Sequence, residues 1–262
     1  MGAFWLKTPA ELGGTPLAPL DFCDVMEEFG YADAATAWTV MVGNGGTGTA
    51  GGWLPDAGAG RVFAPGRPRP LVVGTPGPRG TGRAAPGGYV VSGRWGFASG
   101  VSYADWLLGV FLSNEVPPLC VGIARRALGE IAVLADRTAR FPGGPALSER
   151  AVFRKELGRA QMRVRAARLV HRDAVETALA AAYAGDDLGG AHAAVAAASV
   201  YTVETCAEVI ADLFRYGGGR VLSLASPLQR YLRDALAACQ HIGVSEENYE
   251  RLGRLRIAPA DC

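Results

Sequence analysis

The sequence has few of the residues that build metal centres or disulfide frameworks. Its 262 residues include only three histidines and five cysteines, at positions 23, 120, 206, 239 and 262. No two cysteines form a C-x-x-C pair, and no histidine stands at metal-ligand spacing from them. A dispersed, odd-numbered set of cysteines indicates free thiols in a reducing compartment. We therefore expect a cytoplasmic protein without a resident metal.

Charge is also scarce. Charged residues make up 19% of the chain and the formal net charge is +1, so no overall field attracts nucleic acid or an anionic membrane. The arginines are scattered among acidic residues, and we expect them on solvated helix faces. The N-terminus has no basic segment before a long apolar run, and apolar runs end before about 20 residues accumulate. We expect no signal peptide, no membrane span and no nucleic-acid partner.

Hydrophobic residues, in contrast, make up 49% of the chain, which is enough for a folded core. Residues 1–57 are expected to be helical. Apolar residues recur at helical spacing from Leu20 to Phe29, and Gly30 is typical of a helix end. A second helix is expected over residues 33–53, although its GNGGTGTAGG stretch has low helix propensity. Those glycines indicate close packing or close approach to a ligand.

The rest of the chain changes character twice. Residues 58–116 combine loops rich in glycine, proline and arginine with short apolar or alternating runs, which predicts a small antiparallel sheet of roughly three strands. Residues 117–262 contain four amphipathic stretches, the last over residues 226–252, separated by turn-like breaks. This pattern predicts an antiparallel four-helix bundle. The expected fold is therefore mainly α, with an N-terminal helical segment, a reduced β segment and the bundle.

Three blocks of sequence resemble the acyl-CoA dehydrogenase-like superfamily, most closely its branch of two-component flavin-dependent monooxygenases. The blocks are TPAELGG with EEFGYADAATAW, GGYVVSGRWGFASGVSYADW, and YGGGRVLSLASPLQRYLRDALAACQH. The order of helices, sheet and bundle also resembles that superfamily. Only ten residues separate Trp106 from Pro117, where the family has most of a β-barrel and a Gly-Thr-Gly-Ser-type loop near the flavin. The chain also begins where the family's first helices would end.

The resemblance implies a site. One strand would line a flavin ring or a substrate, and the last bundle helix would hold the cofactor or a subunit contact and present a histidine. The residues at these positions are Trp95, Phe97, Ser99, Arg230, Arg233, Asp234 and His241. Each position also has a structural alternative: a core aromatic, a turn serine, an intrahelical ion pair or a hydrogen-bonded histidine. Asn44, in the glycine-rich helix, is either a polar group in a cavity or a loop residue.

Loss of the barrel and the flavin loop favours an enzyme without a cofactor. We expect it to orient a bulky polyketide-like intermediate of bacterial specialised metabolism for cyclisation, cycloaddition or rearrangement, with His241, Ser99 and Asn44 as catalytic groups that polarise a carbonyl. The alternative is a flavin-dependent monooxygenase or dehydrogenase that binds FMN or FAD and acts on a small organic substrate. A third possibility is an inactive partner subunit of a full-length homologue. In each case the resemblance implies a homodimer or homotetramer assembled through the bundle.

Overall fold

The computed structural model describes residues 2–75, 80–86, 88–93, 95–109, 116–137, 139 and 144–257. Cys262, one of the five cysteines, lies outside these ranges. The chain forms two compact units. Unit 1 consists of Met1–Ala18 and Trp38–Ser113, and unit 2 consists of Pro19–Ala37 and Asn114–Cys262. The N-terminal residues 1–57 therefore contribute to both units.

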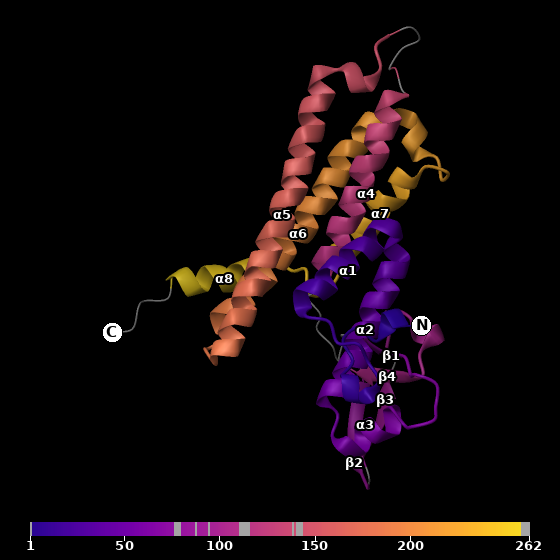
Figure 1. The fold of residues 1–262 in the computed structure, drawn as a ribbon, viewed down its shortest axis with the longest axis vertical. Helices are drawn as coiled ribbons and strands as arrows, with labels where there is room; N and C mark the ends of the chain where they lie inside the picture. Colours follow the sequence, from indigo (N-terminus) through magenta and orange to yellow (C-terminus); the bar gives the residue numbers. More distant parts are fainter. Residues whose placement is uncertain are drawn as a thin grey trace. The chain divides into compact units, whose positions relative to one another are not determined.

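Helices dominate the described residues, so the prediction of a mainly α fold is confirmed (Figure 1). The α-helices are α1 (Pro19–Ala32), α2 (Ala34–Trp53), α3 (Asp56–Val62), α4 (Val116–Asp136), α5 (Ala151–Ala184), α6 (Gly189–Phe214), α7 (Pro227–Ala238) and α8 (Glu247–Ile257). Short 3-10 helices cover Gly2–Phe4, Ala10–Leu12, Val101–Tyr103, Leu147–Glu149 and Arg215–Leu222. The strands are β1 (Val72–Thr75), β2 (Gly80–Ala85), β3 (Gly88–Gly93) and β4 (Trp106–Gly109).

Glycines allow α2 to pack closely inside unit 1. A Cβ on Gly46 would lie 2.2 Å from the carbonyl oxygen of Val72 in β1. A Cβ on Gly43 would lie 2.6 Å from the ring of Phe4. The helix continues through the whole glycine-rich stretch because tertiary packing outweighs low local propensity. Of the two expectations for these glycines, close packing and close approach to a ligand, the structure shows close packing.

The strands form two small sheets instead of one antiparallel sheet. β2 and β3 pair antiparallel, whereas β1 and β4 pair parallel, with Val72 opposite Trp106. Only the β2–β3 pair has the expected orientation. The outer edge of β1 is covered by α2, since Thr47 Oγ1 accepts a hydrogen bond from the Val72 N–H at 3.1 Å and donates one to its carbonyl oxygen at 3.4 Å. A helix side chain thus replaces a neighbouring strand at that position.

Unit 2 is built around α6, which contacts α4, α5, α7 and α8. Its bundle confirms the predicted helices, with one difference. The expected last helix, over residues 226–252, is broken into α7 and α8 by a turn. Among the described residues, Gly189–Leu222 alone is long and apolar enough to cross a membrane, and 72% of its apolar window is buried. That degree of burial is typical of a core helix.

Candidate functional site

The segment from Trp95 to Ser99 lies on unit 1 as irregular chain instead of a strand. Phe97 is 93% exposed and has a φ of 58°, a left-handed conformation that is rare and strained for an aromatic residue. Trp38 Nε1 on α2 donates a hydrogen bond to Ser99 Oγ at 3.1 Å. Trp95 and Ser99 are half-buried. The structure therefore anchors one end of the segment and presents a flat apolar ring beside it.

More apolar side chains are exposed further along this stretch of unit 1. They are Val101, Tyr103, Trp106 and Leu107. Exposed aromatic and aliphatic side chains concentrated in one short stretch are typical of a ligand or contact surface. The resemblance places a flavin ring against this stretch, and its exposed chemistry fits a flat, largely apolar ring.

A second candidate feature is a cavity of about 710 Å³ in unit 2, beside the 3-10 helix Arg215–Leu222. Arg150, Arg215 and Arg220 line it together with Gly217–Gly219. Gly218 has a φ of 63° and a ψ of −163°, a conformation that is close to glycine-only. A Cβ on Gly218 or Gly219 would meet nothing within 4 Å, so the main chain is accessible there. Guanidinium groups and accessible backbone amides are the donors that phosphate groups prefer.

The helix α7 places its predicted residues apart from one another. The Arg230 guanidinium lies 3.7 Å from Oδ1 of Asp33, the residue that separates α1 from α2. It also lies over the ring of Tyr231, 5.6 Å from the ring centroid. Arg233 is exposed. Burial raises the pKa of the Asp234 carboxyl, an effect that nearby Arg230 opposes. The sequence offered an ion pair within this helix as the structural alternative for Arg230. In the structure Arg230 pairs instead with Asp33, outside its own helix.

His241 follows α7 in the turn before α8, not in a helix. Its Nδ1 accepts a hydrogen bond from the Gly243 N–H at 3.1 Å, which leaves the proton of the neutral ring on Nε2. Asn44 is fully buried in unit 1. Its Oδ1 accepts from the Leu6 N–H at 2.7 Å, and its Nδ2 donates to the carbonyl oxygens of Ala3 at 2.6 Å and Val40 at 2.9 Å. These bonds tie the N-terminal segment to α2.

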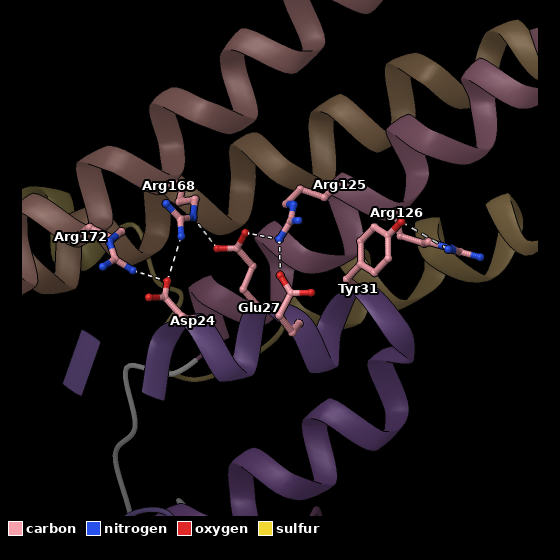
Figure 2. A network of polar contacts seen from close by, with 8 residues as sticks. Asp24, Glu27, Tyr31, Arg125, Arg126, Arg168 and Arg172 are labelled. Atoms are coloured by element: carbon pink, nitrogen blue, oxygen red, sulfur yellow. Dashed lines mark hydrogen bonds and ion pairs between the residues drawn. The ribbon is translucent and has the colours of Figure 1, made fainter. Parts of the chain in front are cut away.

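The sequence did not single out an ionic network on α1. Figure 2 shows Glu27 between two arginines. Glu27 is 5% exposed, with Arg125 Nη1 of α4 at 2.6 Å and Arg168 Nε of α5 at 2.5 Å. Asp24 pairs with Arg168 and Arg172, and Glu28 pairs with Arg125. These arginines clamp α1 to α4 and α5, so the prediction that they only cover solvated faces is wrong for them.

Among the described residues, no group of three or more histidine, cysteine or acidic side chains is arranged to hold a metal ion. Cys120 and Cys206 are buried in the bundle, and burial raises the pKa of both thiols. A raised pKa keeps a thiol protonated and poorly nucleophilic. The cysteines therefore pack as apolar groups, in agreement with the expectation of free thiols.

Known proteins similar to this chain include an acyl-CoA dehydrogenase family and a monooxygenase. Residues 117–246 match the family "Acyl-CoA dehydrogenase, C-terminal domain". The chain is 21% identical to indole-3-acetate monooxygenase from Pseudomonas putida, over 97% of this chain and 84% of that protein. The alignment extends over 328 residues, which is more than the 262 of this chain. The relative therefore has internal stretches without a counterpart here.

Solved structures resemble the whole chain. XiaF from Streptomyces sp., in complex with FADH2 and glycerol, has a TM-score of 0.87 and 17% identity, covering 100% of this chain and 87% of that one. The HsaA monooxygenase from M. tuberculosis has a TM-score of 0.86 and 18% identity, covering 99% and 88%. The predicted acyl-CoA dehydrogenase-like fold is confirmed.

Two predictions from the sequence are corrected by these similarities. The prediction of a cofactor-free enzyme of cyclisation or rearrangement is wrong, because two of the similar proteins are monooxygenases and another, XiaF, is in complex with FADH2. The expectation of no cofactor is wrong for the same reason. Loss of barrel residues was taken as loss of the flavin, yet the exposed Phe97 segment and the arginine–glycine cavity lie outside the lost stretch. The flavin-dependent alternative is therefore favoured.

Proposed function

Since residues 117–246 match an acyl-CoA dehydrogenase C-terminal domain and the fold is acyl-CoA dehydrogenase-like, we propose that this chain is a flavin-dependent monooxygenase acting on a small organic substrate. The observation that carries this proposal is the cavity at Gly217–Gly219. Three arginines and an accessible main chain line about 710 Å³, and this donor set fits the phosphate of FMN or FAD.

Unit 1, considered by itself, has an exposed surface that suits a flat ring system. Phe97 and Trp95 would border the ring system, and Ser99 would hydrogen-bond to the ring or to a substrate oxygen. The Ser99 oxygen already accepts from Trp38, so its own hydroxyl proton is available to donate. When bound, reduced flavin supplies the activation of dioxygen that monooxygenation requires. In this proposal Trp95, Phe97 and Ser99 orient the ring.

Three other predicted residues have narrower proposed roles. His241 keeps a proton on Nε2 that it can donate or exchange near neutral pH, and it is the proposed proton carrier. Arg230 and Arg233 belong to a proposed cofactor or subunit contact on α7, with assembly through the helical bundle as a homodimer or homotetramer. Asn44 is not assigned to chemistry, because its three hydrogen bonds fix the N-terminal segment of unit 1.

The test is an absorbance titration of the purified protein with FMN and FAD, each oxidised and reduced under anaerobic conditions. We expect stoichiometric binding of one flavin with micromolar affinity. Arg215→Gln should weaken it by about tenfold, because a charge-assisted hydrogen bond to phosphate is lost. Arg251→Gln, which changes an exposed arginine on α8, is the matched control and should leave the affinity unchanged. A folded protein that binds neither flavin in either redox state would contradict the proposal.

Activity is tested separately. Reduced flavin, dioxygen and candidate aromatic acids are supplied to the loaded protein, and oxygenated product is measured by mass spectrometry. Indole-3-acetate, named for the Pseudomonas putida relative, is the first substrate to assay. Phe97→Ala should lower both flavin affinity and product yield. Hydrogen peroxide formed without oxygenated product, for every acid tried, would leave flavin binding intact and contradict the monooxygenase assignment for this substrate class.

A further inference from the structure

Unit 2 contains another cavity, of about 740 Å³, between α4 and α5 and beside α1. It shares no lining residue with the cavity at Gly217–Gly219. Helices α4 and α5 run antiparallel (Figure 1), and both contact α1 at one end of the cavity through Arg125 and Arg168. The cavity therefore has a charged end at α1 and extends away from it along the two helices.

At the charged end, the three carboxylates are balanced by the arginines that pair with them, and one further arginine remains. Three carboxylates of α1 line the cavity, and each is paired with arginines of α4 or α5 (Figure 2). Arg165 also lines the cavity, one turn from Arg168. Arg165 makes no ion pair and no hydrogen bond with another of the described residues. Its guanidinium is therefore available to an anionic group at this end.

The remainder of the cavity is mainly apolar, with Gln161 of α5 as a polar side chain among the apolar ones. Leu128, Gly129 and Ala132 of α4 face it from one side, and Leu157 and Val164 of α5 from the other. A Cβ on Gly129 would meet nothing within 4 Å, so the floor is open there. Ala132 lies two helical turns beyond Arg125, which corresponds to about 10 Å of groove. The length, the apolar floor and the cationic end are those of a site for an elongated amphipathic ligand.

We propose that this groove binds an anionic amphiphile, a carboxylate with a linear apolar body of medium length. The carboxylate lies at Arg165, and the apolar body lies over Gly129 and Ala132 against Leu157. Arg165 fixes the orientation, because its positive charge is the one at this end that no carboxylate of the described residues neutralises, and it repels a cationic head group. The site is independent of the proposed flavin site, so it can be present whether or not flavin binds.

The first test is isothermal titration of the full chain with decanoate and, separately, with decyltrimethylammonium, both below their micelle concentrations. We expect decanoate to bind at one site and the cationic probe not to bind. Arg165→Gln should weaken decanoate binding by about threefold to fivefold, the range for an exposed ionic contact. Arg251→Gln, on α8, should have no effect. Equal binding of both probes would indicate a non-specific apolar surface and overturn the proposal.

The second test fills the groove. Gly129→Leu places a side chain into open space in the cavity and should weaken decanoate binding at least tenfold, while the helix keeps or gains stability. Gly158→Leu on α5 is the matched control, since its Cβ also meets nothing within 4 Å and it does not line the cavity. Unchanged binding by Gly129→Leu would overturn the proposal. A second outcome would also overturn it: light scattering shows a dimer that Gly129→Leu disrupts, and decanoate does not bind. The groove would then be a contact with a second copy of the chain.

Discussion

The two units bury a polar side chain in different ways. In unit 1, Asn44 is fully buried and makes all its hydrogen bonds with main-chain groups. In unit 2, Glu27 is almost fully buried and is held by two guanidinium groups. The contacts of Asn44 are neutral hydrogen bonds. The contacts of Glu27 are ionic and link three helices. The difference follows from what surrounds each residue.

Two of the three partners of Asn44, the Leu6 N–H and the Ala3 carbonyl oxygen, belong to the N-terminal segment, and the third, the Val40 carbonyl oxygen, belongs to α2. The N-terminal residues before α1 have main-chain groups that no helix or strand satisfies, and an amide both donates and accepts. In unit 2, the helices satisfy their own main chains, so the contact between them is fixed by side chains. Irregular segments are thus held by neutral amides, whereas helices are held by ionic contacts and by close backbone approach at glycines.

The largest effect is expected where the helices of unit 2 touch. A Cβ on Gly122 of α4 would lie 2.1 Å from the carbonyl oxygen of Glu27, and main-chain atoms cannot move aside. Gly122→Ala should therefore lower the free energy of unfolding by about 3 kcal/mol or more, measured by urea denaturation. Gly129→Ala, on the same helix with open space around it, should raise it by up to about 1 kcal/mol. Equal effects would mean that α1 and α4 do not meet at their backbones.

The second largest loss of stability is expected when the hydrogen bonds of Asn44 in unit 1 are removed. Asn44→Leu leaves the Leu6 N–H and two carbonyl oxygens without their partner, and we expect a loss of about 2–3 kcal/mol. Hydrogen exchange should accelerate in residues 2–18 before it changes in the bundle. Asn248→Leu, which removes a single hydrogen bond to Gly243, should cost about 1 kcal/mol or less. Unchanged exchange in residues 2–18 would show that Asn44 does not hold that segment.

The stability that the ion pairs of Glu27 contribute should depend on salt, whereas the contribution of the Asn44 hydrogen bonds should not. Glu27→Gln keeps the shape of the side chain and removes its charge, and we expect a loss of about 1–2 kcal/mol. The value is modest because the Arg125 and Arg168 side chains are 40% and 36% exposed and are screened by solvent. The loss should shrink between low and high salt, whereas that of Asn44→Leu should stay constant. A salt-independent effect would contradict an electrostatic origin.

The smallest effect concerns the helix that passes from unit 2 into unit 1. Asp33 Oδ2 accepts the Thr36 N–H at 2.8 Å, and hydrogen bonding to Thr36 lowers the pKa of the Asp33 carboxyl. A lowered folded-state pKa stabilises the fold above the unfolded value of about 3.9. That contribution is lost as pH falls through the folded-state pKa.

Asp33→Ala should therefore cost about 1 kcal/mol at pH 7, with a difference from the unchanged protein that shrinks as pH falls below about 3.9 and through the folded-state pKa of Asp33. Asp33→Asn keeps a capping oxygen at every pH and is the control. Thermal unfolding curves across this pH range measure both variants. A difference for Asp33→Ala that persists in acid would assign the effect to something other than the ionised cap.

Part of the candidate site was predicted from sequence, but the arginine-lined cavity at Gly217–Gly219 was not. The resemblance indicated the Phe97 segment and α7. In the structure Phe97 is exposed on unit 1, and α7 is a helix of the bundle in unit 2. The sequence also carried signals for the turn at His241, since Gly243 and Ser245 follow it and interrupt the helical pattern. The role of Asn44 could not be predicted, because two of its three partners are main-chain groups of residues about forty positions away.

The sequence by itself determined the mainly helical fold, the approximate bounds of most helices and the resemblance to flavoenzymes. Periodicity and capping are local, so they survive without knowledge of the neighbours. Tertiary structure alone decided that β1 and β4 pair parallel, that Glu27 is buried between Arg125 and Arg168, and that a groove remains between α4 and α5. Strand pairing, the neutralisation of a buried charge and the shape of a cavity depend on residues brought together from distant parts of the chain, and no local pattern encodes which of them meet.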